Sequence, residues 1–101
     1  MFYIYILHSA SSDIYYVGYT NDYHRRLDEH NHQDYSNTFT SKHRPWIIKG
    51  VFQCGNLEKE AIQIERFIKK QKSRAFIEKI LKMEKFDGVL ASLVRVPHMR
   101  D

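Results

Sequence analysis

The chain has 101 residues, of which 43% are hydrophobic, and its formal net charge is +4. This length suits one small domain built around one hydrophobic core. Cys54 is the only cysteine, which excludes an internal disulfide and a cysteine-rich zinc site. The sequence has no signal-peptide pattern and no apolar run long enough to span a bilayer, so we expect a cytoplasmic protein that does not enter a membrane.

The positive charge is concentrated in the middle of the chain. Residues 1–35 hold two arginines against five acidic residues, a net charge of −3, whereas residues 36–82 hold eleven basic residues against four acidic ones, a net charge of +7. Such a basic segment fits a polyanionic partner, and nucleic acid is the commonest partner of this kind. A solvated helix surface would have the same composition, so charge alone does not decide between them.

Two tyrosine-rich strands are predicted first. The alternation over residues 2–8 puts Tyr3 and Tyr5 on one face of the strand and the isoleucines on the other. A polar turn then leads to a second strand over residues 14–18. We therefore expect Tyr5 and Tyr16 side by side on one sheet.

A helix follows, and Asn21 or Asp22 can cap it. Four of its residues fall at offsets of three, four and seven and so share one face: Tyr23, Arg26, Leu27 and His30. Phenols, a guanidinium and an imidazole thus come from neighbouring elements. This combination suggests a site that handles phosphate.

Residues 32–45 are rich in turn formers and are predicted to be a loop that Pro45 closes. A third strand is expected over residues 46–53. The helix that we predict from about Leu57 to Lys72 has acidic residues in its first turn and lysines in its last, as the helix dipole favours. Its buried stripe is predicted to be Leu57, Ala61, Ile64 and Ile68.

Ser73 can cap a further helix whose apolar residues are Phe76, Ile77, Ile80 and Leu81. The tail over residues 83–101 contains an apolar stretch from Val89 to Val96, which suits either a packed helix or an edge strand. The predicted order is therefore strand, strand, helix, strand, helix, helix, with the tail packed on the same domain.

Several short motifs follow one another along the chain in a fixed order and spacing. They are Tyr3-Ile4-Tyr5, then Tyr16-Val17-Gly18, then Arg26 eight residues past that glycine, His30 four residues further on, and Glu65 on a later helix. In this order they resemble the GIY-YIG nuclease superfamily over roughly residues 2–82. The segments 39–45 and 69–74 look most like the small stand-alone bacterial members.

The resemblance implies an α+β fold in which helices flank a small three-stranded sheet, mixed or antiparallel. It also implies cleavage of phosphodiester bonds with one divalent cation, Mg²⁺ or Mn²⁺. Carried over to this chain, Tyr5 would act on the attacking water and Tyr16 would hydrogen-bond near the same phosphate. Arg26 would neutralise developing charge, His30 would assist proton transfer or positioning, and Glu65 would hold the metal.

Elementary chemistry is compatible with these roles. A guanidinium and a cation are the usual means of stabilising charge on the oxygens of a reacting phosphodiester. One carboxylate suits a magnesium ion that keeps most of its waters. Glu65 also lies four residues before Lys69, however, which is the spacing of an ordinary surface ion pair.

The leading hypothesis is a divalent-metal-dependent DNA endonuclease or structure-selective nuclease, with DNA ahead of RNA as substrate and room for a partner protein or a homodimer. The residues predicted to contact nucleic acid are Lys42, His43, Arg44, Lys69, Lys70, Lys72 and Arg74. Tyr19 follows Gly18 where many active members of the superfamily carry a lysine. The alternative is therefore a weak or inactive domain that keeps the fold and binds nucleic acid or a partner.

Overall fold

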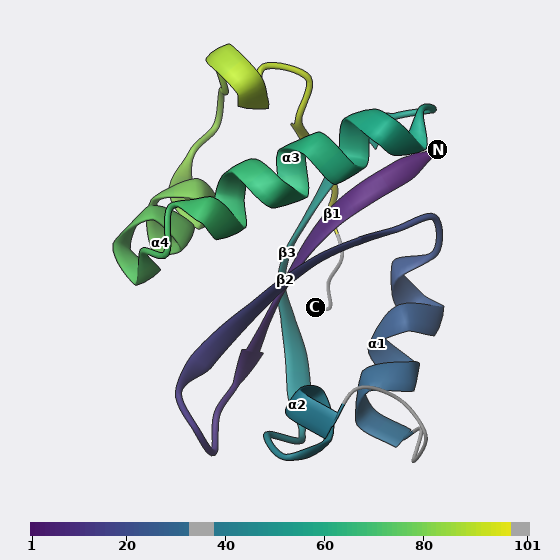
Figure 1. Cartoon of the computed structure of the whole chain (residues 1–101), viewed down its shortest axis with the longest axis vertical. Coiled ribbons are helices and arrows are strands. Elements are labelled where there is room, and N and C mark those ends of the chain that lie inside the picture. Colours follow the sequence, from purple (N-terminus) through teal and green to yellow (C-terminus); the bar gives the residue numbers. More distant parts are fainter. Residues whose placement is uncertain (33–37, 98–101) are drawn as a thin grey trace.

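A four-stranded antiparallel sheet organises the molecule. The computed structural model describes residues 1–32 and 38–97, and within them no helix is long and apolar enough to cross a membrane (Figure 1). The elements are β1 (Phe2–Ser9), β2 (Ile14–Thr20), α1 (Tyr23–His32), α2 (Thr38–Ser41), β3 (Trp46–Gly55), α3 (Glu58–Lys70), α4 (Arg74–Lys82), the 3-10 turn η1 (Gly88–Leu90) and β4 (Val94–Arg95). The strand order is β2-β1-β3-β4, with every neighbouring pair antiparallel. The predicted α+β class is confirmed.

The structure corrects the sequence predictions in three places. The described residues form four strands rather than three, because the tail supplies β4, in which Val94 pairs with Gln53 of β3. The tail is thus an edge strand preceded by a single 3-10 turn. The segment predicted to be a loop contains the short helix α2, and its residues 33–37 lie outside the described part. Leu57, finally, does not belong to the buried stripe of α3.

Local sequence explains where these helices begin. The Asp22 carboxylate accepts a hydrogen bond from the backbone N–H of Arg25 at 3.1 Å, which caps α1. The Ser73 hydroxyl accepts one from the backbone N–H of Phe76 at 3.1 Å and caps α4 as predicted. Leu57 precedes α3 with an extended backbone, so its side chain leaves the helical stripe and is 53% exposed.

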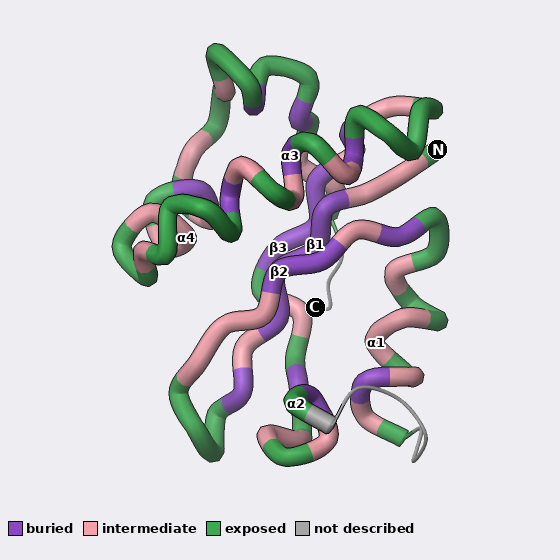
Figure 2. Tube along the Cα trace, viewed as in Figure 1, coloured by how far each residue is buried: buried purple, intermediate pink, exposed green. Residues whose placement is uncertain are grey.

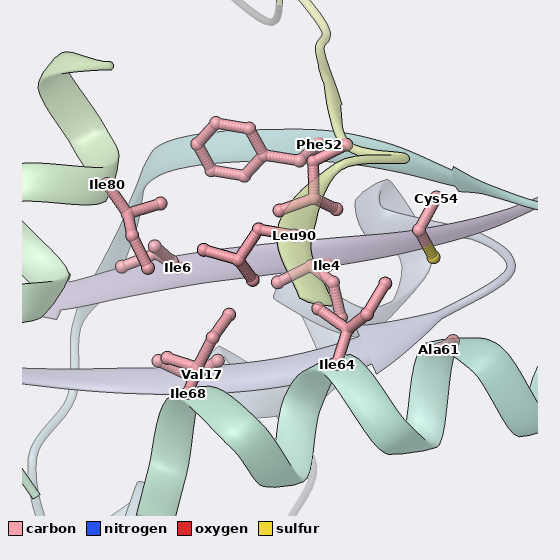
Figure 3. Close-up of a cluster of buried hydrophobic side chains, with 11 residues drawn as sticks. Ile4, Ile6, Val17, Phe52, Cys54, Ala61, Ile64, Ile68, Ile80 and Leu90 are labelled. Atoms are coloured by element: carbon pink, nitrogen blue, oxygen red, sulfur yellow. The ribbon is translucent and has the colours of Figure 1, made fainter. Parts of the chain in front are cut away.

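One face of the sheet carries the main hydrophobic core. Alternation along β1 turns Ile4 and Ile6 toward α3 and α4, and Figure 3 shows these two side chains meeting residues of both helices and of η1. The helices contribute Ala61, Ile64, Ile68 and Ile80, all of them buried. Burial of this apolar surface is the main force that holds α3 across the sheet.

The opposite face is aromatic. Tyr5, Leu7 and Trp46 are buried there, and Tyr23 and Leu27 of α1 pack against them. Figure 1 shows α1 and α3 on opposite sides of the sheet, and Figure 2 shows that the middle of each long strand is buried between them. As predicted, the tyrosines and the isoleucines of β1 therefore face different layers.

Candidate active site

A polar pocket of about 550 Å³ opens at the β2 edge of the sheet, between α1 and α3. Four of the five residues predicted to be catalytic line it, namely Tyr5, Tyr16, Arg26 and Glu65. They come from β1, β2, α1 and α3, so only the folded chain brings them together.

Gly18 gives Tyr5 access to this pocket. The two residues face each other across the β1–β2 pair. A Cβ atom at position 18 would collide with the Tyr5 phenol oxygen, so the tyrosine ring lies directly over the glycine. A residue without a side chain on the edge strand therefore lets a phenol from the inner strand reach the pocket.

His30 lies behind Tyr5 rather than on the pocket wall. Its Nε2 atom is 2.9 Å from the Tyr5 phenol oxygen, and only 1% of the residue is exposed. Burial lowers the pKa of His30 to about 4, and the positive charge of Arg26 acts in the same direction. The imidazole is therefore neutral at pH 7. Its buried Nδ1 atom has no hydrogen-bond partner among the described residues.

Tyr5 is a protonated phenol in the protein at neutral pH. Burial raises the pKa of Tyr5 above its ordinary value, and the neighbouring Tyr16 adds to this effect. The Arg26 guanidinium acts in the opposite direction but does not overcome burial. Any role of Tyr5 as a base consequently requires further positive charge beside the phenol oxygen.

Arg26 forms an ion pair with an acidic residue of its own helix. Its Nη1 atom is 2.8 Å from Oε1 of Glu29, one turn further along α1, and Glu29 also lines the pocket. The second carboxylate oxygen of Glu29 is 3.5 Å from Nε of Arg25. An anionic ligand that binds Nη1 of Arg26 therefore competes with Glu29.

Glu65 and Lys69 form the ion pair that their spacing predicts, with 3.6 Å between Oε2 and Nζ. The Lys69 ammonium also lies 5.2 Å from the centre of the Tyr16 ring, close enough for a cation–π contact. Tyr19 stands where the resemblance to the GIY-YIG superfamily leads us to expect a lysine. It donates a hydrogen bond to Glu58 at 3.0 Å. A cation thus does stand beside Tyr16, but it comes from α3 instead of β2.

The carboxylates of this pocket fit a hydrated divalent cation better than a fully protein-enclosed one. Within residues 1–32 and 38–97, no group of three or more histidine, cysteine or acidic side chains could hold a metal ion. Glu29 and Glu58 are held by Arg26 and Tyr19 at 2.8 and 3.0 Å, whereas the ion pair of Glu65 with Lys69 is longer, at 3.6 Å. The Glu65 side chain is 18% exposed and stands by the two phenols, which suits a magnesium ion that retains most of its waters.

Comparison with known families decides the ancestry. The family model of the GIY-YIG catalytic domain matches residues 1–80. The chain belongs to the GIY-YIG family. A comparison with curated protein sequences gave no match.

The first GIY-YIG motif here begins with Tyr3 instead of glycine, and the structure shows what the extra ring does. Tyr3 packs edge to face on Tyr23 of α1, with 5.2 Å between the ring centres. The substitution thus helps to hold α1 against β1. It does not reach the pocket wall.

The basic residues predicted to bind nucleic acid differ in their surroundings. Lys42, Lys70 and Lys72 are exposed. The other four make contacts within the protein: His43 with the Ser12 hydroxyl, Arg44 with the carbonyl of His30, Lys69 with Glu65, and Arg74 with Asp13 and Glu78. These contacts give Arg44 and Arg74 a part in holding the fold.

Sequence reasoning missed Glu29, Glu58 and Phe39. Glu29 could have been noticed from its three-residue spacing to Arg26. Glu58 and Phe39 gave no such signal, since each takes its place from a contact with β2 that only the fold creates.

Proposed function

We propose that this GIY-YIG domain is a divalent-metal-dependent DNA endonuclease, or a structure-selective nuclease, that hydrolyses phosphodiester bonds. The observation that supports it best is the pocket that Tyr5, Tyr16, Arg26 and Glu65 line together. Two phenols, one guanidinium and one carboxylate beside an open cavity are a set that can receive a phosphodiester together with a cation.

Arg26 is the phosphate ligand in this proposal. The substrate phosphate takes the position of the Glu29 carboxylate beside the guanidinium, and Arg26 then stabilises the negative charge that grows on the phosphate oxygens. Tyr16 donates a hydrogen bond to the same phosphate. Held by Glu65, Mg²⁺ or Mn²⁺ would add positive charge at the phosphate and lower the pKa of a bound water.

Tyr5 and His30 act as a pair. Tyr5 points its phenol oxygen over Gly18 into the pocket, where it contacts the attacking water. Neutral His30 orients that oxygen through the 2.9 Å hydrogen bond. Because His30 is buried and its pKa is low, it serves to position Tyr5 and not to store a positive charge.

The decisive experiment measures cleavage of branched, single-stranded and duplex DNA with magnesium or manganese, and with chelator. We expect Glu65→Gln and Tyr5→Phe to lower the cleavage rate by about 100-fold or more, because each loses a group that acts on the reacting atoms. Glu60→Gln is the matched control, since Glu60 is an exposed glutamate of the same helix outside the pocket. Equal cleavage by all variants would show contamination and refute the assignment.

One arrangement favours a second candidate, a weak or inactive domain that binds nucleic acid or a partner protein. Without a ligand, the Tyr19 phenol is hydrogen-bonded to Glu58 and the Arg26 guanidinium is paired with Glu29. Both side chains are therefore held by contacts within the protein. This candidate predicts salt-sensitive DNA binding and no metal-dependent cleavage. The same DNA substrates, assayed for binding and for cleavage side by side, separate the two candidates.

A further inference from the structure

A second cavity adjoins the proposed phosphate pocket. It has a volume of about 250 Å³ and lies where β2, α2, the end of α3 and the start of α4 meet. Tyr16 lines both cavities, and its ring centre is 6.4 Å from that of Tyr5 and 6.2 Å from that of Phe39. A ligand that spans the two cavities would therefore contact Tyr16.

The second cavity has an aromatic wall, and the buried Trp46 packs against the ring of Phe39. The Phe39 ring centre is 6.2 Å from that of Tyr16 and 6.4 Å from that of Trp46. Trp46 is 1% exposed, and its indole N–H donates a 2.8 Å hydrogen bond to the carbonyl of Thr40 in α2. The helix that carries Phe39 is thereby fixed, while Phe39 itself is 43% exposed.

The rim of the cavity is positively charged. Lys69 places its ammonium 5.2 Å from the Tyr16 ring centre, and Lys72 lines the same cavity. Among residues 1–32 and 38–97, no acidic side chain lines it. Flat apolar rings beside ammonium groups complement a ligand that has a flat aromatic part attached to anionic groups, which is the chemistry of a nucleotide.

We infer that this cavity receives an unstacked nucleobase next to the phosphate held in the first pocket, with Phe39 as the stacking residue and with Lys69 and Lys72 beside the flanking phosphates. This inference rests on the proposed nuclease function, since Tyr16 belongs to both sites. A base inside a regular duplex is already stacked on its neighbours and cannot enter. The substrate class is therefore nucleic acid with an unpaired nucleotide at the cleavage site, such as a single strand, a flap or a bulge.

The test uses a short single-stranded DNA that contains one 2-aminopurine, whose fluorescence is quenched when the base stacks on an aromatic ring. Chelator in the buffer prevents metal-dependent cleavage, so only binding is measured. We expect Phe39→Ala to weaken binding roughly 5- to 100-fold and to abolish the protein-dependent quenching. Phe39→Trp should retain both. Replacing the 2-aminopurine nucleotide by an abasic one should weaken binding to the wild type but not to Phe39→Ala.

Ile47→Ala is the matched control, because Ile47 is 49% exposed on β3 and lies outside the cavity. Binding and quenching by Phe39→Ala equal to those of the wild type would overturn the inference, even if the protein cleaves DNA. Quenching that depends on Phe39 in a protein that never cleaves DNA would support the base site and refute the nuclease assignment. The two failures are thus distinguishable.

Discussion

His30 combines burial, a single hydrogen bond and a neighbouring cation in one side chain. Nε2 is paired with Tyr5, whereas Nδ1 is buried without a partner among the described residues. Protonation would place a second N–H donor in that unpartnered position and a positive charge close to Arg26. The folded state therefore excludes the proton that an unfolded chain would bind.

We predict that stability falls as the pH drops from about 6.5 to about 4. The pKa of His30 is about 4 in the folded protein and 6.5 ordinarily, so in this range the unfolded chain binds a proton that the folded one does not. At pH 4.5 the loss in the free energy of unfolding from this residue should be roughly 2 to 3 kcal/mol. Urea denaturation at pH 7 and pH 4.5 measures it.

The control for this experiment is an exposed histidine of the same helix. His30→Gln should lose less stability between the two pH values than the wild type, whereas His24→Gln, at an exposed position of α1, should behave like the wild type. If all three proteins lost the same amount, His30 would not be the group that responds to pH.

The pairing of β1 with β2 determines which side chain reaches the pocket. Tyr5 faces Gly18 across the two strands, and Leu7 faces Tyr16. Tyr5 and Tyr16 are therefore diagonal neighbours on one face, with 6.4 Å between their ring centres. A shift of β2 by one residue would move the Tyr16 phenol to the opposite layer, away from Tyr5.

We predict that Gly18→Ala destabilises the fold by roughly 1 to 3 kcal/mol, because the added methyl group collides with the Tyr5 phenol. DNA cleavage should fall with it, since Tyr5 must move. In a Tyr5→Leu background the methyl group meets no phenol, so Gly18→Ala should cost much less. A double-mutant cycle by thermal or urea denaturation measures this coupling. Additive effects would show that the glycine is needed for another reason.

Elements with a repeated pattern were predictable from the sequence, and those defined by contact were not. The alternation in β1 and the cap at Ser73 depend on neighbouring residues, and the structure confirms both. The two-residue strand β4 shows no periodicity, and the four-residue helix α2 lies among turn formers. Both form because tertiary contacts outweigh local preference.

The residues of the candidate site likewise fall into those that the sequence predicted and those that only the fold revealed. The spacing of Tyr5, Tyr16, Arg26 and Glu65 was readable because each follows a motif within its own element. The structure then places all four around one pocket. Phe39 lies within a segment that looked like a loop, and only the packing of α2 on Trp46 brings it beside Tyr16. Its position beside Tyr16 could not be predicted from the linear order of the residues.

At the scale of the molecule, the basic charge of the chain lies mainly on the helices that follow β3. Arg74 is held by Asp13, with 2.8 Å between Nη2 and Oδ1, and by Glu78, so part of its charge is neutralised within the protein. Lys70 and Lys72 are exposed at the end of α3. These two lysines are the better candidates to exchange bound ions for phosphates when nucleic acid binds.

We predict that DNA affinity falls steeply with salt and that Lys70→Gln and Lys72→Gln each weaken binding at low salt. Each substitution should also make the slope of log K against log salt shallower by about 0.7 for a single strand or about 0.9 for a duplex. Arg74→Gln should change this slope less and should lower thermal stability, because its loss leaves Asp13 without its guanidinium partner. Fluorescence anisotropy over a series of salt concentrations gives the slopes.

Lys85→Gln, an exposed lysine of the tail, is the control and should leave the slope unchanged. A slope that responds equally to Lys85 and Lys72 would mean that net charge alone, and not the end of α3, attracts the DNA.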